Sequence, residues 1–334
     1  MSGLSLLTGF SEATEAPTVI HKEADLIDVH HHILPKVYIQ SLAKIGITKT
    51  NNLPFPRWNT QRSIDAMDRN GIRAAITSIS SPGVYFGDTD FAITLSRRCN
   101  EFSANLVQQY PGRFGGFAIL PLPDTQAALA ELEYALDVLK LDGIILLSNI
   151  GGKYLGDPQF DEVYAELDRR KAIVYVHPTE PINDRFPKMN LPPSFFEFIF
   201  DTTRSVATLI GRDIPGRFSN IRFIIAHAGG AAPYLAWKMS LTARISSGDG
   251  NRAVSCLKRF YYDTALSTSQ YPLKLLSDLA GTGHILFGSD SPFAPEVVTS
   301  SCIWELKNQA GFNQDIFKKI FATNATGLFP RFNV

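Results

Sequence analysis

LIDVHHHILP (residues 26–35) joins a short apolar run to three consecutive histidines. The run over residues 26–30 has the length and character of a buried β-strand, and His30 and His32 stand at its end. Because alternate side chains of an extended chain share a face, His30 and His32 can point into one site while His31 points away. Two imidazoles at that spacing form a metal clamp, whereas three adjacent histidines could instead form a solvated surface turn.

Apolar, β-branched runs of this kind recur along the whole chain. Several are continuously apolar, which is typical of strands buried on both faces. The pattern predicts further strands over residues 74–79, 114–120, 143–147, 173–177, 222–227, 260–263 and 285–288. Helical patterns are predicted over residues 60–70, 95–109, 125–140, 161–170, 194–210, 232–245, 271–280, 296–309 and 315–321.

Strand and helix therefore alternate about eight times, which favours a parallel α/β architecture and predicts a (β/α)8 TIM barrel. An open doubly wound sheet is the alternative, but no GxGxxG follows the first strand. We expect residues 1–24 to form a polar N-terminal arm and residues 25–334 to form one barrel domain. Residues 48–59 are expected to form a long loop.

Composition excludes several classes of function. Lys+Arg and Asp+Glu are both 32, so the formal net charge is zero. Binding to nucleic acid or to an anionic membrane surface needs a surplus of positive charge, so we expect neither partner. Hydrophobic residues are 45% and charged residues 19% of the 334, the proportions of a folded globular protein.

The three cysteines are far apart and form no CxxC pair. That pattern disfavours a disulfide framework or a zinc knuckle, and reduced thiols favour a cytoplasmic location. No apolar run approaches the roughly 20 residues of a membrane span, and no secretory signal is recognisable.

Titratable side chains follow three other predicted strands. His177 ends one apolar run, His227 ends another, and Asp290 comes directly after a third. In a parallel barrel the C-terminal ends of all strands lie on one rim, where catalytic residues collect. We therefore expect these three residues to converge with His30 and His32. His21 and His284 lie outside this pattern, and we interpret both as structural or solvent-facing.

These segments resemble the metal-dependent amidohydrolase superfamily, in its decarboxylase branch. The resemblance spans nearly the whole chain from about residue 25. It rests on DVHHHILP (28–35), HP (177–178), HAGG (227–230) and GSDSPF (288–293), with support from MDRNGI (67–72), SSPG (80–83) and DTTR (201–204). Within that branch, SSPG and DTTR are most similar to the methylsalicylate decarboxylases.

The resemblance implies roles for the matching positions. His30, His32, His177 and Asp290 would bind one divalent metal ion, and His227 and Asp290 would act in proton transfer. A mixed nitrogen and oxygen ligand set suits zinc, with manganese as an alternative. Two-metal members of the superfamily commonly carry a carboxylated lysine after the fourth strand, where this chain has Ser148; a single-metal site is therefore expected. The resemblance also implies a homodimer.

Three residues are candidates for contact with the substrate, each with a structural alternative. Arg204 could anchor a carboxylate through its guanidinium, or pair with Asp201 to fix the start of a helix. Phe293 could stack on an aromatic ring, or pack under the rim. Trp58 could close over a substrate, or anchor an exposed loop.

The resemblance, together with the expected single-metal site, implies non-oxidative decarboxylation of a small ortho-hydroxy aromatic acid, with 6-methylsalicylate converted to m-cresol and CO2. The same five residues could instead hydrolyse a lactone or amide, with Asp290 as the base. A barrel retained only for binding is a third hypothesis, which an intact set of metal ligands disfavours.

Overall fold

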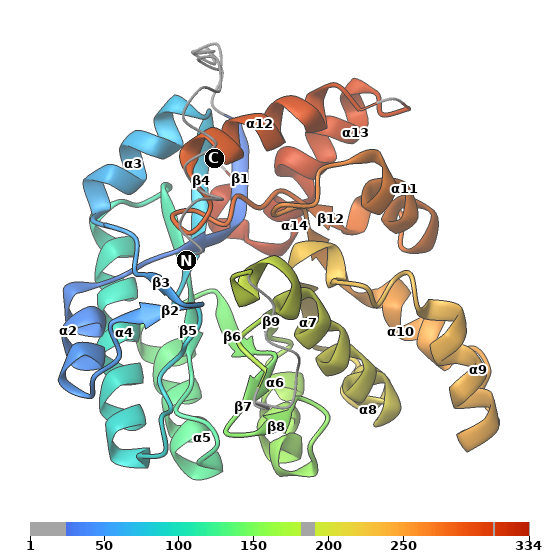
Figure 1. Cartoon of the computed structure of the whole chain (residues 1–334), viewed down its shortest axis with the longest axis horizontal. Helices are drawn as coiled ribbons and strands as arrows, with labels where there is room; N and C mark the ends of the chain where they lie inside the picture. The colour runs from blue at the N-terminus through green and yellow to red at the C-terminus, as the bar shows by residue number, and fades with distance from the viewer. Residues whose placement is uncertain (1–24, 182–190, 310, 334) are drawn as a thin grey trace.

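The computed structural model describes residues 25–181, 191–309 and 311–333 (Figure 1). Eight parallel strands form one sheet in the order β1-β4-β5-β6-β9-β10-β11-β12. Their bounds are β1 (Leu26–His32), β4 (Ile72–Ser78), β5 (Phe114–Ile119), β6 (Gly143–Leu147), β9 (Ile173–His177), β10 (Arg222–Ile225), β11 (Tyr261–Asp263) and β12 (Ile285–Leu286).

The sheet curls so that its first and last strands meet. Beyond β12 the extended chain reaches β1 through three backbone hydrogen bonds: Val29 N to Phe287 O at 2.9 Å, Asp290 N to His30 O at 2.9 Å, and His32 N to Ser291 O at 2.6 Å. The predicted (β/α)8 barrel is confirmed. These three bonds, called the seam below, place the histidines of β1 beside Asp290.

Helices connect the strands and surround the barrel (Figure 1). Each predicted helix is present, with shifts at its ends. The α-helices are α2 (Lys36–Lys44), α3 (Thr60–Arg69), α4 (Thr89–Gln109), α5 (Thr125–Glu133), α6 (Asp161–Arg169), α7 (Pro193–Gly211), α8 (Ile214–Arg217), α9 (Ala236–Ser247), α10 (Arg252–Arg259), α11 (Gln270–Leu279), α12 (Glu296–Lys307), α13 (Gln314–Lys318) and α14 (Asn324–Leu328). Two π-helical turns, Tyr134–Val138 and Lys319–Thr323, continue α5 and α13.

Side-chain caps explain where several helices begin. Helix α4 starts six residues before the expected position, because the Asp88 carboxylate accepts a hydrogen bond from Phe91 N at 3.0 Å. Asp124 caps α5 in the same way through Ala127 N at 2.9 Å. Capping of this kind satisfies amide groups that a helix N-terminus otherwise leaves unpaired.

Two further segments differ from the expectations. Strand β1 extends to His32 rather than ending at residue 30, because the seam and the Ile33 N to Ser78 O bond continue its ladder. The expected loop over 48–59 contains a two-stranded antiparallel ladder, β2 (Lys49–Thr50) with β3 (Leu53–Pro54). Asn51 and Asn52 turn between them with positive φ, a conformation that asparagine tolerates. The expected N-terminal arm, 1–24, lies outside the described residues.

Aromatic side chains fill the barrel beneath its C-terminal rim. The Tyr175 ring stacks on Phe117 with centroids 5.2 Å apart, and Phe117 contacts Phe329 at 5.8 Å. All three are buried. Because these side chains fill the barrel interior, any site at this end must open at the rim. Within the described residues, no helix combines the length and apolar character needed to cross a membrane.

Candidate metal centre

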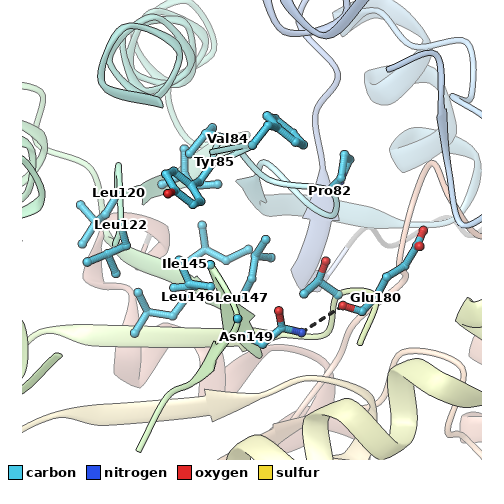
Figure 2. Close-up of a pocket in the computed structure, with 16 residues that line it drawn as sticks. Pro82, Val84, Tyr85, Leu120, Leu122, Ile145, Leu146, Leu147, Asn149 and Glu180 are labelled. Atoms are coloured by element: carbon cyan, nitrogen blue, oxygen red, sulfur yellow. Dashed lines mark hydrogen bonds between the residues drawn. The ribbon is translucent and has the colours of Figure 1, made fainter. Parts of the chain in front are cut away.

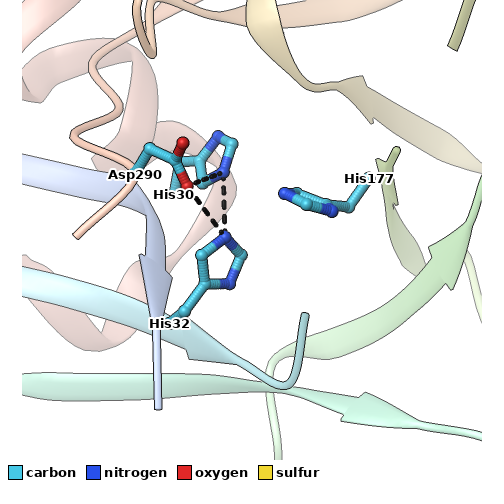
Figure 3. Close-up of side chains that lie close together, drawn as sticks. All are labelled: His30, His32, His177 and Asp290. Carbon is cyan, nitrogen blue, oxygen red and sulfur yellow. Dashed lines mark hydrogen bonds and ion pairs between the residues drawn. The ribbon is translucent and has the colours of Figure 1, made fainter. Parts of the chain in front are cut away.

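Four buried side chains converge at the C-terminal rim of the barrel (Figure 3). His30 and His32 come from β1, His177 ends β9, and Asp290 follows β12 at the seam. His30 Nε2 lies 3.0 Å from His32 Nε2, and Asp290 Oδ1 lies 3.3 Å from each of these nitrogens. One donor atom from each of the four residues falls within 4.8 Å of the others. A tetrahedral ion with bonds of 2.0–2.1 Å needs ligand atoms about 3.4 Å apart, so the spacing fits a single ion.

Each imidazole in this cluster is oriented through its other ring nitrogen. The three contacts are His30 Nδ1 with Asp263 Oδ2 at 3.0 Å, His32 Nδ1 with Ser78 Oγ at 2.9 Å, and His177 Nδ1 with Pro178 O at 2.7 Å. A carboxylate and a carbonyl can only accept, so His30 and His177 carry their ring proton on Nδ1. Nε2 is then the ring nitrogen that each of these two residues can offer to a metal ion, and hydrogen bonds to the other ring nitrogen orient histidine ligands in this way.

His177 provides a direct test of whether a metal fits. Its Nε2 is buried and has no hydrogen-bond partner. A buried polar atom left unpaired costs free energy, and such atoms are rare in folded proteins. A cation held between this nitrogen and the other three donors satisfies it. The donor set therefore fits one divalent ion, as the sequence led us to expect.

The electrostatics of the cluster also favour a cation. Burial opposes a charge on His30, but Asp263 and Asp290 outweigh it and raise the pKa of His30 to about 10. Burial likewise opposes ionisation of Asp290, yet His30 and hydrogen bonds from His30 and His32 hold its pKa well below the ordinary value. Burial lowers the pKa of His32 to about 4. Two carboxylates therefore stabilise one positive charge here, which a metal ion supplies in place of a proton.

His227 stands beside this cluster. Its ring centroid is 4.8 Å from that of His30 and 5.8 Å from that of His177. Nδ1 donates to Ala265 O at 3.0 Å, which leaves Nε2 as the free ring nitrogen. His227 and Ala228 both have positive φ, 51° and 55°. Such strain persists only where surrounding contacts hold it, and it concentrates at functional sites.

Asp263, at the end of β11, is the functional residue that sequence reasoning missed. Its Oδ2 accepts from His30 Nδ1 and from the Tyr175 hydroxyl at 3.1 Å, while Oδ1 accepts from His227 N at 3.0 Å. One buried carboxylate thus orients a predicted ligand and the predicted proton-transfer residue. The available signal was the one that identified Asp290, an aspartate at the end of an apolar strand.

His31 points away from the cluster, as predicted. Its Nδ1 contacts Asp28 Oδ2 at 3.0 Å, and its Nε2 contacts the Ser63 hydroxyl. Asp28 also accepts from the backbone of Ser289 at 3.0 Å, so this carboxylate ties β1 to the chain after β12. His284 lies before β12, stacked on Tyr261 with centroids 4.5 Å apart, consistent with a structural role. His21 lies outside the described residues.

A glycine keeps the seam and the cluster close together. A Cβ added at Gly288 would lie 2.8 Å from His30 Cβ and 3.1 Å from Asp263 Cβ. Contacts that short force neighbouring atoms to move. The absence of a side chain at Gly288 therefore allows His30 and its carboxylate partner to sit at their observed separation.

The three residues predicted to bind substrate lie in different surroundings, and only one of them is seen to border the cluster. The Phe293 ring contacts His32 with centroids 5.5 Å apart, so it borders the cluster. Trp58 packs on Phe102 of α4 at 5.9 Å, which favours its role as a loop anchor. Arg204 lies on α7 with a guanidinium nitrogen 3.9 Å from Asp201 Oδ1, which favours pairing with Asp201. The pair lies in the interior of α7 rather than at its start, so the expected role in fixing a helix start is wrong.

An eight-stranded parallel barrel with titratable side chains gathered on its C-terminal rim defines the class of TIM-barrel enzymes. The chain belongs to the amidohydrolase family, whose model matches residues 27–331.

Three proteins of known name or structure are similar to this chain over most of its length. A 6-methylsalicylic acid decarboxylase of Penicillium expansum is 35% identical over 277 residues, covering 80% of this chain and 85% of that protein. The crystal structure of an amidohydrolase II superposes with a TM-score of 0.86 at 31% identity, over 91% of this chain and 99% of that one. A 5-carboxyvanillate decarboxylase of Novosphingobium aromaticivorans, complexed with manganese, shares the fold with a TM-score of 0.80 at 22% identity, over 91% and 96% of the two chains.

Proposed function

We propose that the protein is a metal-dependent, non-oxidative decarboxylase of an ortho-hydroxy aromatic acid, with 6-methylsalicylate as substrate and m-cresol and CO2 as products. The observation that carries the proposal is the buried cluster of three imidazoles and one carboxylate, in which His177 Nε2 has no protein partner. Membership of the amidohydrolase family and similarity to a 6-methylsalicylic acid decarboxylase support the reaction and the substrate.

His30, His32, His177 and Asp290 would hold one divalent ion. When bound, the ion supplies a Lewis-acidic centre for the carboxylate and the neighbouring hydroxyl of the substrate. Zinc suits the mixed nitrogen and oxygen donors, and manganese accompanies a structurally similar decarboxylase. The protein positions these donors before substrate arrives, because Asp263 and the Pro178 carbonyl fix two of the imidazoles.

Decarboxylation requires a proton at the ring carbon that carries the carboxylate. The bond from that carbon to the carboxylate then breaks, its electrons return to the ring, and CO2 leaves. We assign the proton relay to Nε2 of His227, whose Nδ1 is committed to Ala265 O. Burial lowers the pKa of His227, so its protonated ring gives up a proton readily and is left neutral after the transfer. Asp290, beside His30, is the second group within the cluster able to take part.

Substrate contacts and assembly form the remaining parts of the proposal. Phe293, at the edge of the cluster, would stack on the aromatic ring. Arg204 and Trp58 remain candidates for the carboxylate and for a covering side chain. We also propose a homodimer, because α9 exposes an apolar stripe at Trp237 and Ile245, whose exposed fractions are 69% and 88%.

The decisive experiment measures CO2 release from 6-methylsalicylate before and after chelation, with identification of the organic product. The proposal expects CO2 and m-cresol in equal amounts, lost on chelation and restored by zinc or manganese. Release of CO2 that survives complete metal removal would contradict the metal's role. Folded, metal-loaded protein that releases no CO2 from any ortho-hydroxybenzoate, but hydrolyses lactones or amides, would replace decarboxylation with hydrolysis.

A further inference from the structure

An apolar pocket lies at the C-terminal ends of β5 and β6 (Figure 2). Its volume is about 260 Å³. An apolar cavity of roughly 150 Å³ already accommodates benzene. The pocket therefore has room for a group larger than a methyl substituent.

Strand register places the pocket next to the cluster. Leu147 lines the pocket and lies beside His177 in the pairing of β6 with β9. Paired residues of neighbouring parallel strands share a face, so Leu147 points into the barrel mouth as His177 does. Ile145 and Ile119 are paired with each other two residues below and continue the same wall. The pocket and the cluster are consequently two sides of one barrel mouth.

Polar groups around the pocket already have partners within the protein. Asn149 Nδ2 donates to Glu180 O at 3.0 Å. The Glu180 carboxylate accepts from Asn51 N at 2.8 Å, and the Thr179 hydroxyl lies 2.9 Å from that of Ser81. The Tyr85 hydroxyl is the remaining side-chain polar group of the described lining.

Away from the Tyr85 hydroxyl, a hydroxyl or carboxylate placed against this wall would lose hydration with little in return, whereas a hydrocarbon group gains by leaving water. The pocket thus selects between polar and apolar groups through the chemistry of its walls, in addition to selecting by size.

We propose that this pocket binds an apolar ring substituent of the aromatic acid, and that the enzyme prefers substrates with an alkyl group longer than methyl. The inference rests on the proposed decarboxylase function and names the substrate class for it. Leu147 and Ile150 are the specificity-determining residues. Leu147 packs on the open face of Gly83, where an added Cβ would lie 2.7 Å from its Cδ1, so a larger side chain at 147 must extend into the pocket.

The test compares kcat/KM for CO2 release from salicylates with hydrogen, methyl, propyl or pentyl at position 6, and from 2,6-dihydroxybenzoate. We expect kcat/KM to rise by roughly fourfold for each methylene that the pocket buries, and to be lowest for the dihydroxy acid.

Three variants test which residues form the pocket. In Leu147→Phe, kcat/KM should no longer rise from the methyl substrate to the propyl and pentyl substrates. Ile150→Asn, at a half-buried position outside the barrel interior, should likewise remove the increase in kcat/KM with alkyl length. Val138→Asn, at an exposed position on a π-helical turn, serves as the matched control and should keep the wild-type order.

Binding of toluene and pentylbenzene to metal-free protein, measured by calorimetry, gives a readout independent of turnover. Tighter binding of pentylbenzene to the wild type, weakened in Ile150→Asn, supports the pocket. CO2 release that is the same for methyl and pentyl substrates overturns the inference and leaves the proposed function standing. No CO2 from any member of the series overturns the proposed function itself.

Discussion

Asp263 serves two residues of the site with a single carboxylate. It holds the imidazole of His30 through Oδ2 and the strained backbone of His227 through Oδ1. Desolvation by burial opposes its ionisation, yet His30 and hydrogen bonds lower the pKa of Asp263, so it stays charged. In the proposed mechanism, metal affinity and proton transfer would both depend on this one side chain, which is not among the four candidate ligands.

Replacing this carboxylate should weaken metal binding. In Asp263→Asn the amide removes the negative charge beside His30, so we expect metal affinity to fall by roughly 10- to 100-fold, the usual effect of losing such a partner. A competition titration against a coloured chelator measures it. Asp142→Asn, which alters a carboxylate paired with Arg331, is the control and should leave affinity unchanged. Equal affinity in Asp263→Asn and wild type would refute the assignment.

Removing the His227 ring should reduce turnover while leaving metal binding intact. Nδ1 of His227 is committed to Ala265 O and the ring is not among the four ligands, so His227→Ala should retain the metal. We expect kcat to fall about 10²- to 10⁴-fold, the usual contribution of a positioned acid or base. Steady-state kinetics and metal content are measured together. His284→Ala, stacked on Tyr261, should keep near wild-type kcat. Full activity without the His227 ring would exclude it as the relay.

The site shows which residues a sequence can predict. His30, His32, His177 and Asp290 were predicted because a titratable residue after an apolar strand is rare, and four such residues on one rim converge. Asp263 carries the same signal, but its contacts depend on how β11 and β1 are placed on the two sides of β12 in the closed barrel. That geometry follows from the tilt and stagger of the closed sheet, which no local pattern encodes.

Among the elements, helix α6 carries a charge cluster whose pH dependence can be measured. The Glu166 carboxylate accepts from Arg169 at 2.7 Å and from Arg170 at 2.6 Å. These hydrogen bonds lower the pKa of Glu166 to about 2. A carboxyl with a lowered pKa stabilises the fold above its unfolded pKa and loses that contribution as pH falls.

Glu166→Gln should therefore reduce the free energy of unfolding at pH 7 by about 1 kcal/mol, a value limited by the partial exposure of the pair. The difference from wild type should shrink as pH falls from about 4.5 toward 2. Urea denaturation at pH 7, 5, 4 and 3 measures it. Glu162→Gln, whose partner is the neutral Gln126, is the control. A difference that stays constant with pH would contradict the ion-pair origin.

Elements were predicted best where hydrophobic pattern alone decides them. Strands β6 and β9 have the predicted bounds because each is a continuous apolar run. Helix α4 was predicted too short, because its first turn depends on the Asp88 cap rather than on periodicity. The β2–β3 ladder was missed because each strand has only two residues, and the pairing depends on the positive φ of Asn51 and Asn52.

At the scale of the whole molecule, α9 is the feature that bears on assembly. Trp237, Leu241 and Ile245 recur every fourth residue and are exposed by 69%, 42% and 88%, so they form one apolar stripe. Figure 1 shows α9 at the periphery, on the side of the barrel occupied by α10. A helix that turns its apolar side outward is typical of a contact surface.

The double variant Trp237→Glu/Ile245→Glu should dissociate the proposed homodimer, because two buried carboxylates would face the partner's apolar stripe. Light scattering after size exclusion should give twice 36.9 kDa for the wild type and 36.9 kDa for the variant. Val138→Glu, an exposed apolar position elsewhere, should remain dimeric. A wild-type mass of 36.9 kDa would contradict the homodimer and its assignment to this stripe.

The seam has a consequence for how the protein is made. Its bonds join residues near the start of the chain, Val29 and His32, to residues 287 and 291 near the end. A ribosome releases these two segments far apart in time, so a nascent chain holds His30 and His32 long before it has Asp290. The first histidines must therefore wait, without their carboxylate partner, until nearly all of the barrel has emerged. Capture of a metal by the complete set of proposed ligands would thus be a late event in the synthesis of the protein, coinciding with closure of the barrel.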